Sequence, residues 1–350
     1  MLAAMRFPAW LKPEIIPGLP FRWYGLMYVV AFGVAWLLFR HESRRRRAPW
    51  SEDDEAGFFF WAIVGLLVGA RLFGTLVYDP TRYYWAKPWL IFWPFDESGR
   101  FSGFQGMSYH GGVVGVVVAT FVFCKAKRFR WLEWTDVLTL SVPLGYTAGR
   151  LGNFINGELW GKVSSGPIGM IFPNVPDSGR FPAREAWVQE AADRAGIRLG
   201  SMNDLVNLPR HPSQLYEAFF EGIVLWLLLW FLVRKRKAFP GFATGLYVIG
   251  YAVFRFFIEY LREPDAGIGF VIGDKSAPTY LYAGPWNLST GQVLCLLMVA
   301  GGLLFLAFGA LIEKRRPSLL AQAEAARAES GRAEPKRPSG EARKLRKKIK

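Results

Sequence analysis

The sequence predicts an all-α polytopic membrane protein with seven transmembrane helices and a small head domain outside the bilayer. Of its 350 residues, 52% are hydrophobic and 16% are aromatic, a load that soluble domains seldom carry. The apolar residues stand in blocks about 20 residues long, which is the length that crosses a bilayer. Basic clusters follow alternate blocks, so the sequence also predicts how the chain is oriented.

Seven apolar blocks are the predicted spans, and they cover residues 21–40, 57–78, 109–124, 137–157, 215–233, 242–260 and 290–312. Basic clusters follow the first, third, fifth and seventh blocks, at residues 44–47, 125–130, 234–237 and 314–316. Loops rich in Lys and Arg remain cytoplasmic, so the N-terminus is predicted outside and the C-terminus inside. The net charge of +15 follows this topology, and its distribution argues against a nucleic-acid partner.

Three segments between or after the spans have their own character. The outward loop near 79–108 is rich in Trp, Tyr and Phe, which favours an arm lying in the lipid headgroup layer. Segment 162–210 carries Gly, Pro and Asp turn signals and one predicted short helix near 183–195. The predicted organisation is therefore spans one to four with the arm in 1–161, a head segment in 162–210, spans five to seven in 211–316, and a basic cytoplasmic tail, disordered or loosely helical, in 317–350.

Polar residues gather at the outer ends of the predicted spans. Ionisable side chains at membrane depth cost roughly a few kcal/mol each, so they usually serve a function. The cytoplasmic halves of the same spans carry almost none. The outer set consists of Tyr24 in the first span, Arg71 in the second, His110 in the third, Arg150, Asn153, Asn156 and Glu158 at the end of the fourth, Glu217 and Glu221 at the start of the fifth, and Arg255, Glu259, Arg262 and Glu263 at the end of the sixth.

Helical spacing places several of these residues on common faces. Arg150 and Asn153 are three residues apart, and Arg255 and Glu259 are four apart. Small-xxx-small glycine pairs in the second, third and fourth spans allow helices to approach closely and could bring Arg150, Arg255 and His110 around one cavity. Simpler interpretations stay open: a structural ion pair for Arg255 with Glu259, a helix cap for His110, interhelical hydrogen bonds for the asparagines, and an aromatic belt for Tyr24.

Several chemistries lack their sequence motifs. Three scattered histidines and two cysteines do not make a zinc site, so no metal and no cofactor are predicted. A Gly-x-Ser-x-Gly elbow and a P-loop are both missing from the sequence.

The segment Gly149-Arg150-Leu151-Gly152-Asn153-Phe154-Ile155-Asn156-Gly157-Glu158, ending at Gly161, resembles the signature of the bacterial prolipoprotein diacylglyceryl transferases. Further similar motifs are Trp23 to Tyr28, Met107 to Gly112, Arg210 to Glu217, and Phe254 to Asp265. They occur in nearly all the predicted spans and in the expected order, whereas segment 162–210 and the tail lie outside the pattern.

This resemblance implies that the chain transfers the sn-1,2-diacylglyceryl group from phosphatidylglycerol to the lipobox cysteine of a prolipoprotein signal peptide. The products would be a thioether and glycerol phosphate, formed at the outer leaflet of the bacterial inner membrane. The implied phosphatidylglycerol-binding residues are Arg150, Asn153, Asn156, Glu158 and Gly161.

The residues also fit this chemistry on physical grounds. A thiol with a pKa near 8.5 is mostly protonated at neutral pH, so a base assists it. An arginine fork suits a leaving phosphate. We expect Arg255 to stabilise the leaving phosphate, Glu259 to position Arg255, and Tyr24 to add a hydrogen bond. His110 is the candidate base, although Glu259 or the phosphate itself could also take the proton.

Two other classes of function compete with a transferase. A lipid transporter or flippase needs a polar path through both leaflets, which the apolar cytoplasmic halves of the spans do not provide. A membrane scaffold or lipid sensor would explain the small-residue packing but not the two outward-facing arginine positions.

Overall fold

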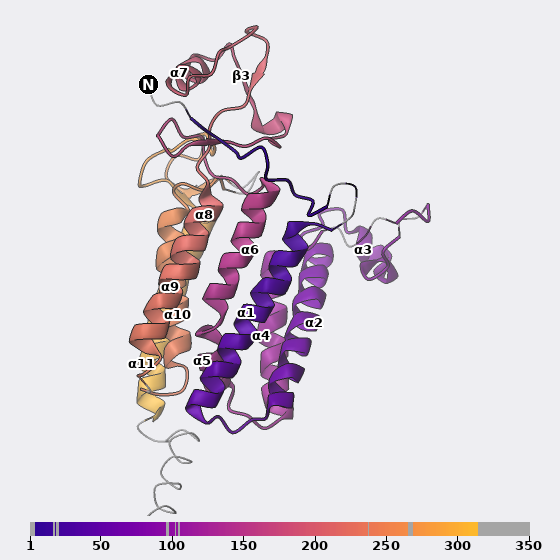
Figure 1. Cartoon of the computed structure of the whole chain (residues 1–350), viewed down its shortest axis with the longest axis vertical. Helices are drawn as coiled ribbons and strands as arrows, with labels where there is room; N and C mark the ends of the chain where they lie inside the picture. Colours follow the sequence, from indigo (N-terminus) through magenta and orange to yellow (C-terminus); the bar gives the residue numbers. More distant parts are fainter. Residues whose placement is uncertain are drawn as a thin grey trace, which may run out of the picture.

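The computed structural model describes residues 4–313, apart from 17, 19–20, 96–97, 102, 104–105, 237 and 265–268. Long helices form a bundle, with irregular segments gathered at one end (Figure 1). Within the described residues, five helical stretches are long and apolar enough to cross a membrane, and α10 (Phe242–Ile258) is a shorter apolar helix. The five are Trp23–Arg46, Glu52–Leu76, Tyr109–Ala126, Ser213–Val233 and Thr290–Ile312. The chain is thus a mostly helical, polytopic membrane protein.

The predicted fourth span is not one helix, and that expectation was wrong. Block 137–157 is divided between α5 (Trp131–Thr139) and α6 (Val142–Asn156), with a turn at residues 140–141. Pro143 lies in the first turn of α6. Proline has no backbone N–H and its ring clashes with the preceding turn, so it begins a helix but does not continue one. Figure 1 shows α6 in the upper part of the bundle and α5 in the lower part.

The helical stretch Ser213–Val233, which the sequence predicts as the fifth span and which we call the fifth pass, contains two π-helical segments. It runs through α8 (Ser213–Glu217), the π-helical η3 (Ala218–Val224), α9 (Leu225–Leu227) and the π-helical η4 (Leu228–Val233). π-helical turns are rare and occur frequently at functional sites. The first of them begins directly after Glu217, whose side chain is fully buried.

Close helix packing confirms the predicted role of several glycines. Helices α2 (Glu52–Leu76) and α4 (Tyr109–Ala126) approach so closely that a Cβ on Gly69 would lie 2.3 Å from the Gly111 carbonyl oxygen. A Cβ on Gly145 of α6 would lie 2.6 Å from the Ala31 carbonyl oxygen of α1 (Trp23–Arg46). Gly149 has open space at this position, so the fourth-span pair contributes one contact glycine rather than two.

Three of the basic clusters lie at the same end of the bundle. The ends of α1 and η4 meet there, because the Arg45 guanidinium donates to the Arg234 carbonyl oxygen at 3.1 Å. Lys127, after α4, pairs with Asp54 at the start of α2 at 2.8 Å. An aromatic core, in which Phe39, Phe58 and Trp134 are fully buried, lies at this end of the helices. The fourth cluster, 314–316, lies outside the described residues.

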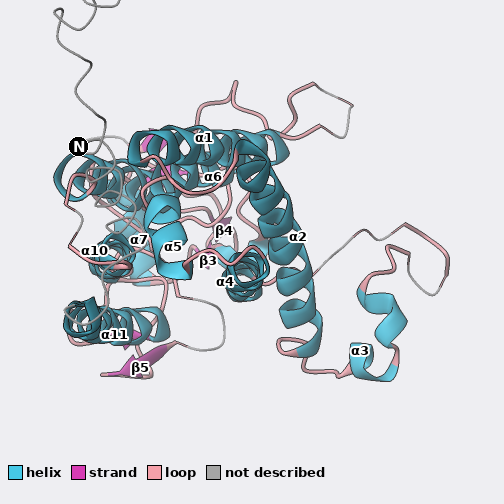
Figure 2. Ribbon diagram, turned by 90° about the horizontal axis from the view of Figure 1, so that it is seen from below, coloured by secondary structure: helices cyan, strands magenta, loops and turns pink. Residues whose placement is uncertain are grey.

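The opposite end carries the head segment and the arm. The head contains α7 (Ala186–Arg194) and a short antiparallel sheet of β3 (Phe181–Pro182) and β4 (Leu205–Val206). Two more two-stranded sheets join β1 (Met5–Arg6) to β2 (Met170–Ile171) and β5 (Phe270–Ile272) to β6 (Leu288–Ser289), next to α11 (Thr290–Glu313). Helix α3 (Tyr83–Ala86) and the short turn η1 (Pro88–Ile91) form the arm, and Figure 2 shows α3 standing apart from the bundle beyond α2.

Candidate functional site

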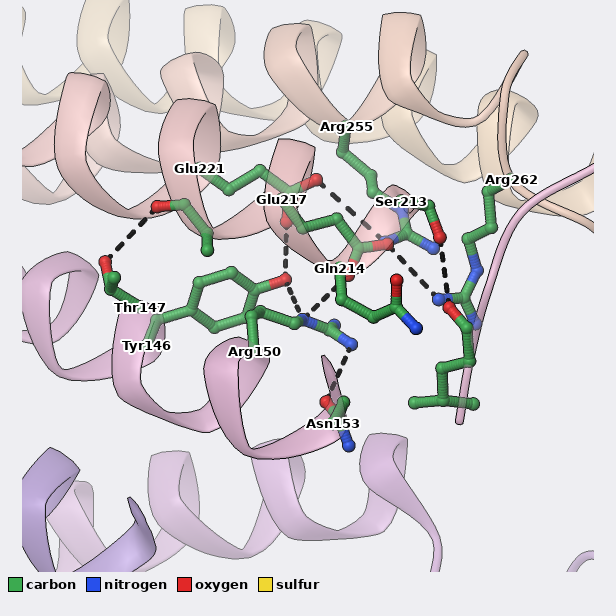
Figure 3. A network of polar contacts seen from close by, with 12 residues as sticks. Tyr146, Thr147, Arg150, Asn153, Ser213, Gln214, Glu217, Glu221, Arg255 and Arg262 are labelled. Atoms are coloured by element: carbon green, nitrogen blue, oxygen red, sulfur yellow. Dashed lines mark hydrogen bonds and ion pairs between the residues drawn. The ribbon is translucent and has the colours of Figure 1, made fainter. Parts of the chain in front are cut away.

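A fully buried glutamate joins three arginines at the head end of the bundle. Glu217 Oε2 lies 2.8 Å from Arg150 Nε, and Glu217 Oε1 lies 3.0 Å from an Arg255 nitrogen and 3.2 Å from an Arg262 nitrogen. The glutamate side chain is 0% exposed, and the arginine side chains are 11%, 15% and 16% exposed. Figure 3 shows the three guanidinium groups converging on this carboxylate. We call Arg150, Arg255 and Arg262, together with the glutamates that they contact, the arginine cluster.

Helix α6 supplies one side of the arginine cluster. The Arg150 Nε donates to the Tyr146 hydroxyl at 2.6 Å, and a terminal nitrogen of Arg150 donates to Asn153 Oδ1 at 3.5 Å. The Tyr146 hydroxyl donates in turn to Glu221 Oε2 of the fifth pass. These spacings of three and four residues lie on one face of a helix, so a single helical stripe holds the three side chains together.

Close contact between α6 and the fifth pass requires a glycine. A Cβ on Gly222 would lie 2.1 Å from Thr147 Oγ1, and the Thr147 hydroxyl donates to the Ala218 carbonyl oxygen at 3.3 Å. The π-helical stretch η3 and its Gly222 therefore lie where the segment that carries Glu217 and Glu221 packs against α6.

Helix α10 and the residues after it supply the other side. An Arg255 nitrogen lies 2.9 Å from Glu259 Oε2, and the Ser289 hydroxyl donates to Glu259 Oε1 at 3.0 Å. Gly291, at the start of α11, leaves room for this carboxylate, because a Cβ there would lie 2.7 Å from Glu259 Oε1. The Glu259 side chain therefore lies at the N-terminus of α11, where the helix dipole attracts negative charge.

The end of the signature segment is fixed by its own hydrogen bonds. Glu158 Oε1 accepts from Asn153 Nδ2 at 3.0 Å and from Asn156 Nδ2 at 3.4 Å. Gly161 is tightly enclosed: a Cβ would lie 2.2 Å from the Leu261 carbonyl oxygen and 3.0 Å from the His211 Cβ. The signature residues therefore surround Arg150 and anchor the segment that follows it.

The arginine cluster is balanced in charge. Arg150, Arg255 and Arg262 face the carboxylates of Glu217, Glu221 and Glu259, with Glu221 Oε1 3.9 Å from an Arg255 nitrogen. Buried charges persist in low-dielectric surroundings only when they are paired. Preorganised guanidinium groups in such a site act more strongly on an anion than they would in water.

The structure brings some predicted residues together and leaves others apart. Arg150, Asn153, Arg255 and Glu259 all belong to the arginine cluster or contact it directly. His110 is exposed at the start of α4, where its Nδ1 lies 2.9 Å from the Tyr78 hydroxyl, and among the described residues no hydrogen bond or ion pair joins it to the three arginines.

Tyr24 lies beside α6 rather than within the arginine cluster. Its hydroxyl is 2.9 Å from that of Tyr28, and its Cα would lie 3.6 Å from a Cβ on Gly152. Within the described residues, no group of three or more His, Cys, Asp or Glu side chains could hold a metal ion.

Sequence reasoning missed the centre of the site. Glu217 was recognised as an ionisable residue opening the fifth span, yet it received no role, and Tyr146 was not singled out. A usable signal was present, because two carboxylates four residues apart, Glu217 and Glu221, occur in an otherwise apolar block.

Comparison with known proteins identifies the class of this membrane protein. The family model for prolipoprotein diacylglyceryl transferase matches residues 13–308. Two relatives named phosphatidylglycerol–prolipoprotein diacylglyceryl transferase come from Treponema denticola, at 51% identity over 90% of this chain and 97% of the relative, and from Treponema pallidum, at 53% over 85% and 92%. A relative of the same name from Campylobacter jejuni is 37% identical over 82% and 89%.

The protein is thus a multi-pass membrane transferase. More particularly, the chain belongs to the prolipoprotein diacylglyceryl transferase family, as its signature segment predicted.

Proposed function

We propose that this protein transfers the sn-1,2-diacylglyceryl group of phosphatidylglycerol to the lipobox cysteine thiol of a prolipoprotein, releasing glycerol phosphate. This reaction is the first step of bacterial lipoprotein maturation. The observation that carries the proposal is the arginine cluster, a buried group of three guanidinium groups at the head end of a membrane-embedded bundle. Family membership adds the identity of the two substrates.

Arg150 binds the phosphate of phosphatidylglycerol in this proposal, and Asn153 and Asn156 orient the headgroup. Arg150 uses its Nε for Glu217 and Tyr146, which leaves its terminal nitrogens toward Asn153. A guanidinium fork held from behind in this way can present two parallel donors to a phosphate. Glu158 supports the amides through their hydrogen bonds, and Gly161 permits the close packing at the end of the segment.

Arg255 stabilises the negative charge that grows on the leaving phosphate, and Glu259 positions it. The 2.9 Å ion pair between Arg255 and Glu259, itself braced by Ser289, supports this division of roles. Removing a preorganised donor from a developing anion typically costs about 10²–10³ in rate.

His110 is the proposed base, and Tyr24 contributes a supporting hydrogen bond. The tyrosine hydroxyl near His110 Nδ1 can fix the orientation of the ring, which leaves the other nitrogen for a thiol. Glu259 is a poorer base, because its oxygens are already engaged by Arg255 and Ser289. A His110→Gln variant with unchanged transfer at neutral pH would exclude the imidazole as base.

The proposed topology has seven passes, with the N-terminus outside and the C-terminus in the cytoplasm of a bacterial inner membrane. Three basic clusters lying at one end of the bundle support it, since such clusters remain cytoplasmic. The site then faces the outer leaflet, where phosphatidylglycerol and a newly exported precursor are both accessible. The proposed divisions remain spans one to four with the arm, head segment 162–210, spans five to seven, and a cytoplasmic tail whose residues 317–350 lie outside the described part.

A reconstitution assay tests the proposed activity. Purified protein is incubated with phosphatidylglycerol and a lipobox peptide, and the peptide mass is measured. We expect a gain of one diacylglyceryl unit, no gain when serine replaces the peptide cysteine, and no gain with Arg150→Ala. Lipid movement between leaflets without peptide modification would instead identify a flippase and contradict the proposal.

A further inference from the structure

Lys162, directly after the signature segment, is a buried lysine whose charge is not paired within the described part of the chain. Its residue is 3% exposed, and its Nζ lies 5.3 Å from the centre of the Phe270 ring. Among the described residues, its ammonium group has neither a hydrogen-bond partner nor an ion-pair partner. An ammonium withdrawn from water without a partner is costly, so such a group marks a candidate binding position for an anion.

Backbone hydrogen bonds hold Lys162 next to two segments of the arginine cluster. The Lys162 N–H donates to the Leu261 carbonyl oxygen at 2.9 Å, and the His211 N–H donates to the Lys162 carbonyl oxygen at 2.9 Å. Leu261 immediately precedes Arg262, and His211 leads into the fifth pass. The lysine is therefore held between the two elements that supply Glu217 and Arg262.

The Phe270 ring, which lies beneath the ammonium group, is also connected to the arginine cluster. Phe270 pairs with Ser289 in the β5–β6 sheet, and the Ser289 hydroxyl donates to Glu259. Glu259 and Glu263 both attract the Lys162 charge from a distance. Glu259 is already paired with Arg255, and Glu263 lies 2.6 Å from an Arg210 nitrogen. Both glutamates that attract Lys162 are thus already paired with an arginine, so neither neutralises the lysine by direct contact.

The proposed reaction raises the negative charge on the bound phosphate by one. Sulfur forms a bond to the glyceryl carbon, the carbon–oxygen bond to phosphate breaks, and its electron pair stays on the phosphate oxygen. The thiol proton passes to the base. A phosphodiester with one negative charge becomes a phosphate monoester with about two, because the second pKa of such a group is near 6. The three arginines already face three glutamates, so the arginine cluster has no net positive charge to balance the added negative charge.

We propose that Lys162 binds the leaving glycerol phosphate by pairing with the second negative charge of this monoester. The inference rests on the proposed function and adds a residue that distinguishes product from substrate. Burial lowers the pKa of the Lys162 ammonium group, and a phosphate dianion beside it would favour its charged form.

Product inhibition tests this role. Protein in phosphatidylglycerol nanodiscs is assayed with added glycerol phosphate for the unaltered chain, Lys162→Met, Lys162→Arg and the control Lys275→Met, which replaces an exposed lysine of the same outer region. We expect Lys162→Met to raise the inhibition constant about tenfold or more, as for loss of a charged hydrogen bond. Lys162→Arg and Lys275→Met should stay near the unaltered value, and the KM for phosphatidylglycerol should change little.

A direct binding measurement distinguishes the role of Lys162 from the proposed transferase activity. A ³¹P NMR titration of glycerol phosphate needs no turnover, and Lys162→Gln replaces Lys162→Met if the latter does not fold. Unchanged product affinity in the folded variant would overturn the role of Lys162 while leaving the transferase activity intact. An equal rise in the KM for phosphatidylglycerol would also overturn it, because the lysine would then bind either phosphate. Failure of the unaltered chain to modify the peptide would instead contradict the proposed function.

Discussion

Two buried glutamates hold arginines at opposite ends of the bundle, and they do so in different ways. At the basic end, Glu42 is 0% exposed and contacts Arg45 and Arg46, three and four residues further along the same helix. At the head end, Glu217 contacts arginines 38 and 45 residues away, on and after α10, as well as Arg150 on α6. The short contacts of Glu42 are local to a helix end, with only a 3.9 Å approach from the distant Arg234, whereas every arginine contact of Glu217 exists only when the whole bundle has assembled.

This contrast separates a structural ion pair from a candidate site. A local pair forms as soon as its helix forms, and it commits its charges to one another. A cluster assembled from separate elements holds guanidinium groups in a fixed arrangement that an incoming anion can use without reorganising them. The largest differences between the two ends should therefore appear in catalysis, and smaller ones in stability.

Removing single arginines should give the largest effect. Arg150→Ala and Arg255→Ala are each expected to lower transfer by about 10²–10³ or more, because each removes a preorganised donor to phosphate. Arg45→Ala, at the other end, should leave turnover near the unaltered value. The measurement is the rate of lipobox peptide modification at saturating lipid, with membrane insertion as the control. Near-normal transfer by Arg150→Ala would remove that residue from the mechanism.

Neutralising the central glutamates sharpens the comparison further. Glu217→Gln leaves three arginines facing an amide, and removing one member of a buried ion pair typically costs about 3–5 kcal/mol. We expect Glu217→Gln to lose both thermal stability and transfer, whereas Glu42→Gln loses stability with turnover per folded molecule retained. Both quantities are read from thermal unfolding in detergent and from activity normalised to folded protein. Equal loss of turnover in the two variants would contradict the distinction.

Ser289→Ala should have an intermediate effect. Its hydroxyl braces Glu259, so the change removes one hydrogen bond to a charged group, worth about 1.5–3 kcal/mol. If Glu259 positions Arg255, this loss appears as a lower kcat with little change in the KM for lipid. Steady-state kinetics with varied phosphatidylglycerol decide the point, and a change confined to KM would assign Ser289 to substrate binding instead.

The smallest predicted effect is a pH dependence in the head-end loops. Burial, and then the nearby Lys162, lower the pKa of His211 from its ordinary value. The unfolded chain therefore binds more protons than the folded chain as pH falls through about 6.5, and stability decreases there. His211→Gln should flatten this dependence in thermal unfolding measured from pH 8 to pH 5. An identical slope in both proteins would mean that other groups control the titration.

Much of the architecture was predictable because hydrophobic length is a local property. The block at 290–312 corresponds closely to Thr290–Glu313, and the apolar block at 242–260 to Phe242–Ile258. The break before α6 was not predicted, although Pro143 stood inside the block as a local warning. The π-helical stretches of the fifth pass had no sequence signal, since their formation depends on contacts with other helices.

The site was predictable where its members are helical neighbours. Arg255 with Glu259 and Arg150 with Asn153 follow from spacings of four and three residues, and the structure confirms both contacts. The role of Glu217 depends on how α6, the fifth pass and α10 meet, which no single stretch of sequence encodes. The role of Lys162 was likewise not predictable from the sequence, because its burial depends on which side chains the fold places around it.

The π-helical turns after Glu217 have a consequence for how the fifth pass tolerates change in length. Deleting one residue from 218–224 could restore regular α-helical bonding, but each α-helical residue adds about 100° of rotation, so the carboxylate of Glu217 would swing away from its arginines relative to the membrane-embedded remainder. A shortened helix with better backbone bonding would then be an inactive one. The π-helical turn thus lets Glu217 face its arginines while the rest of the fifth pass keeps its own orientation in the bundle.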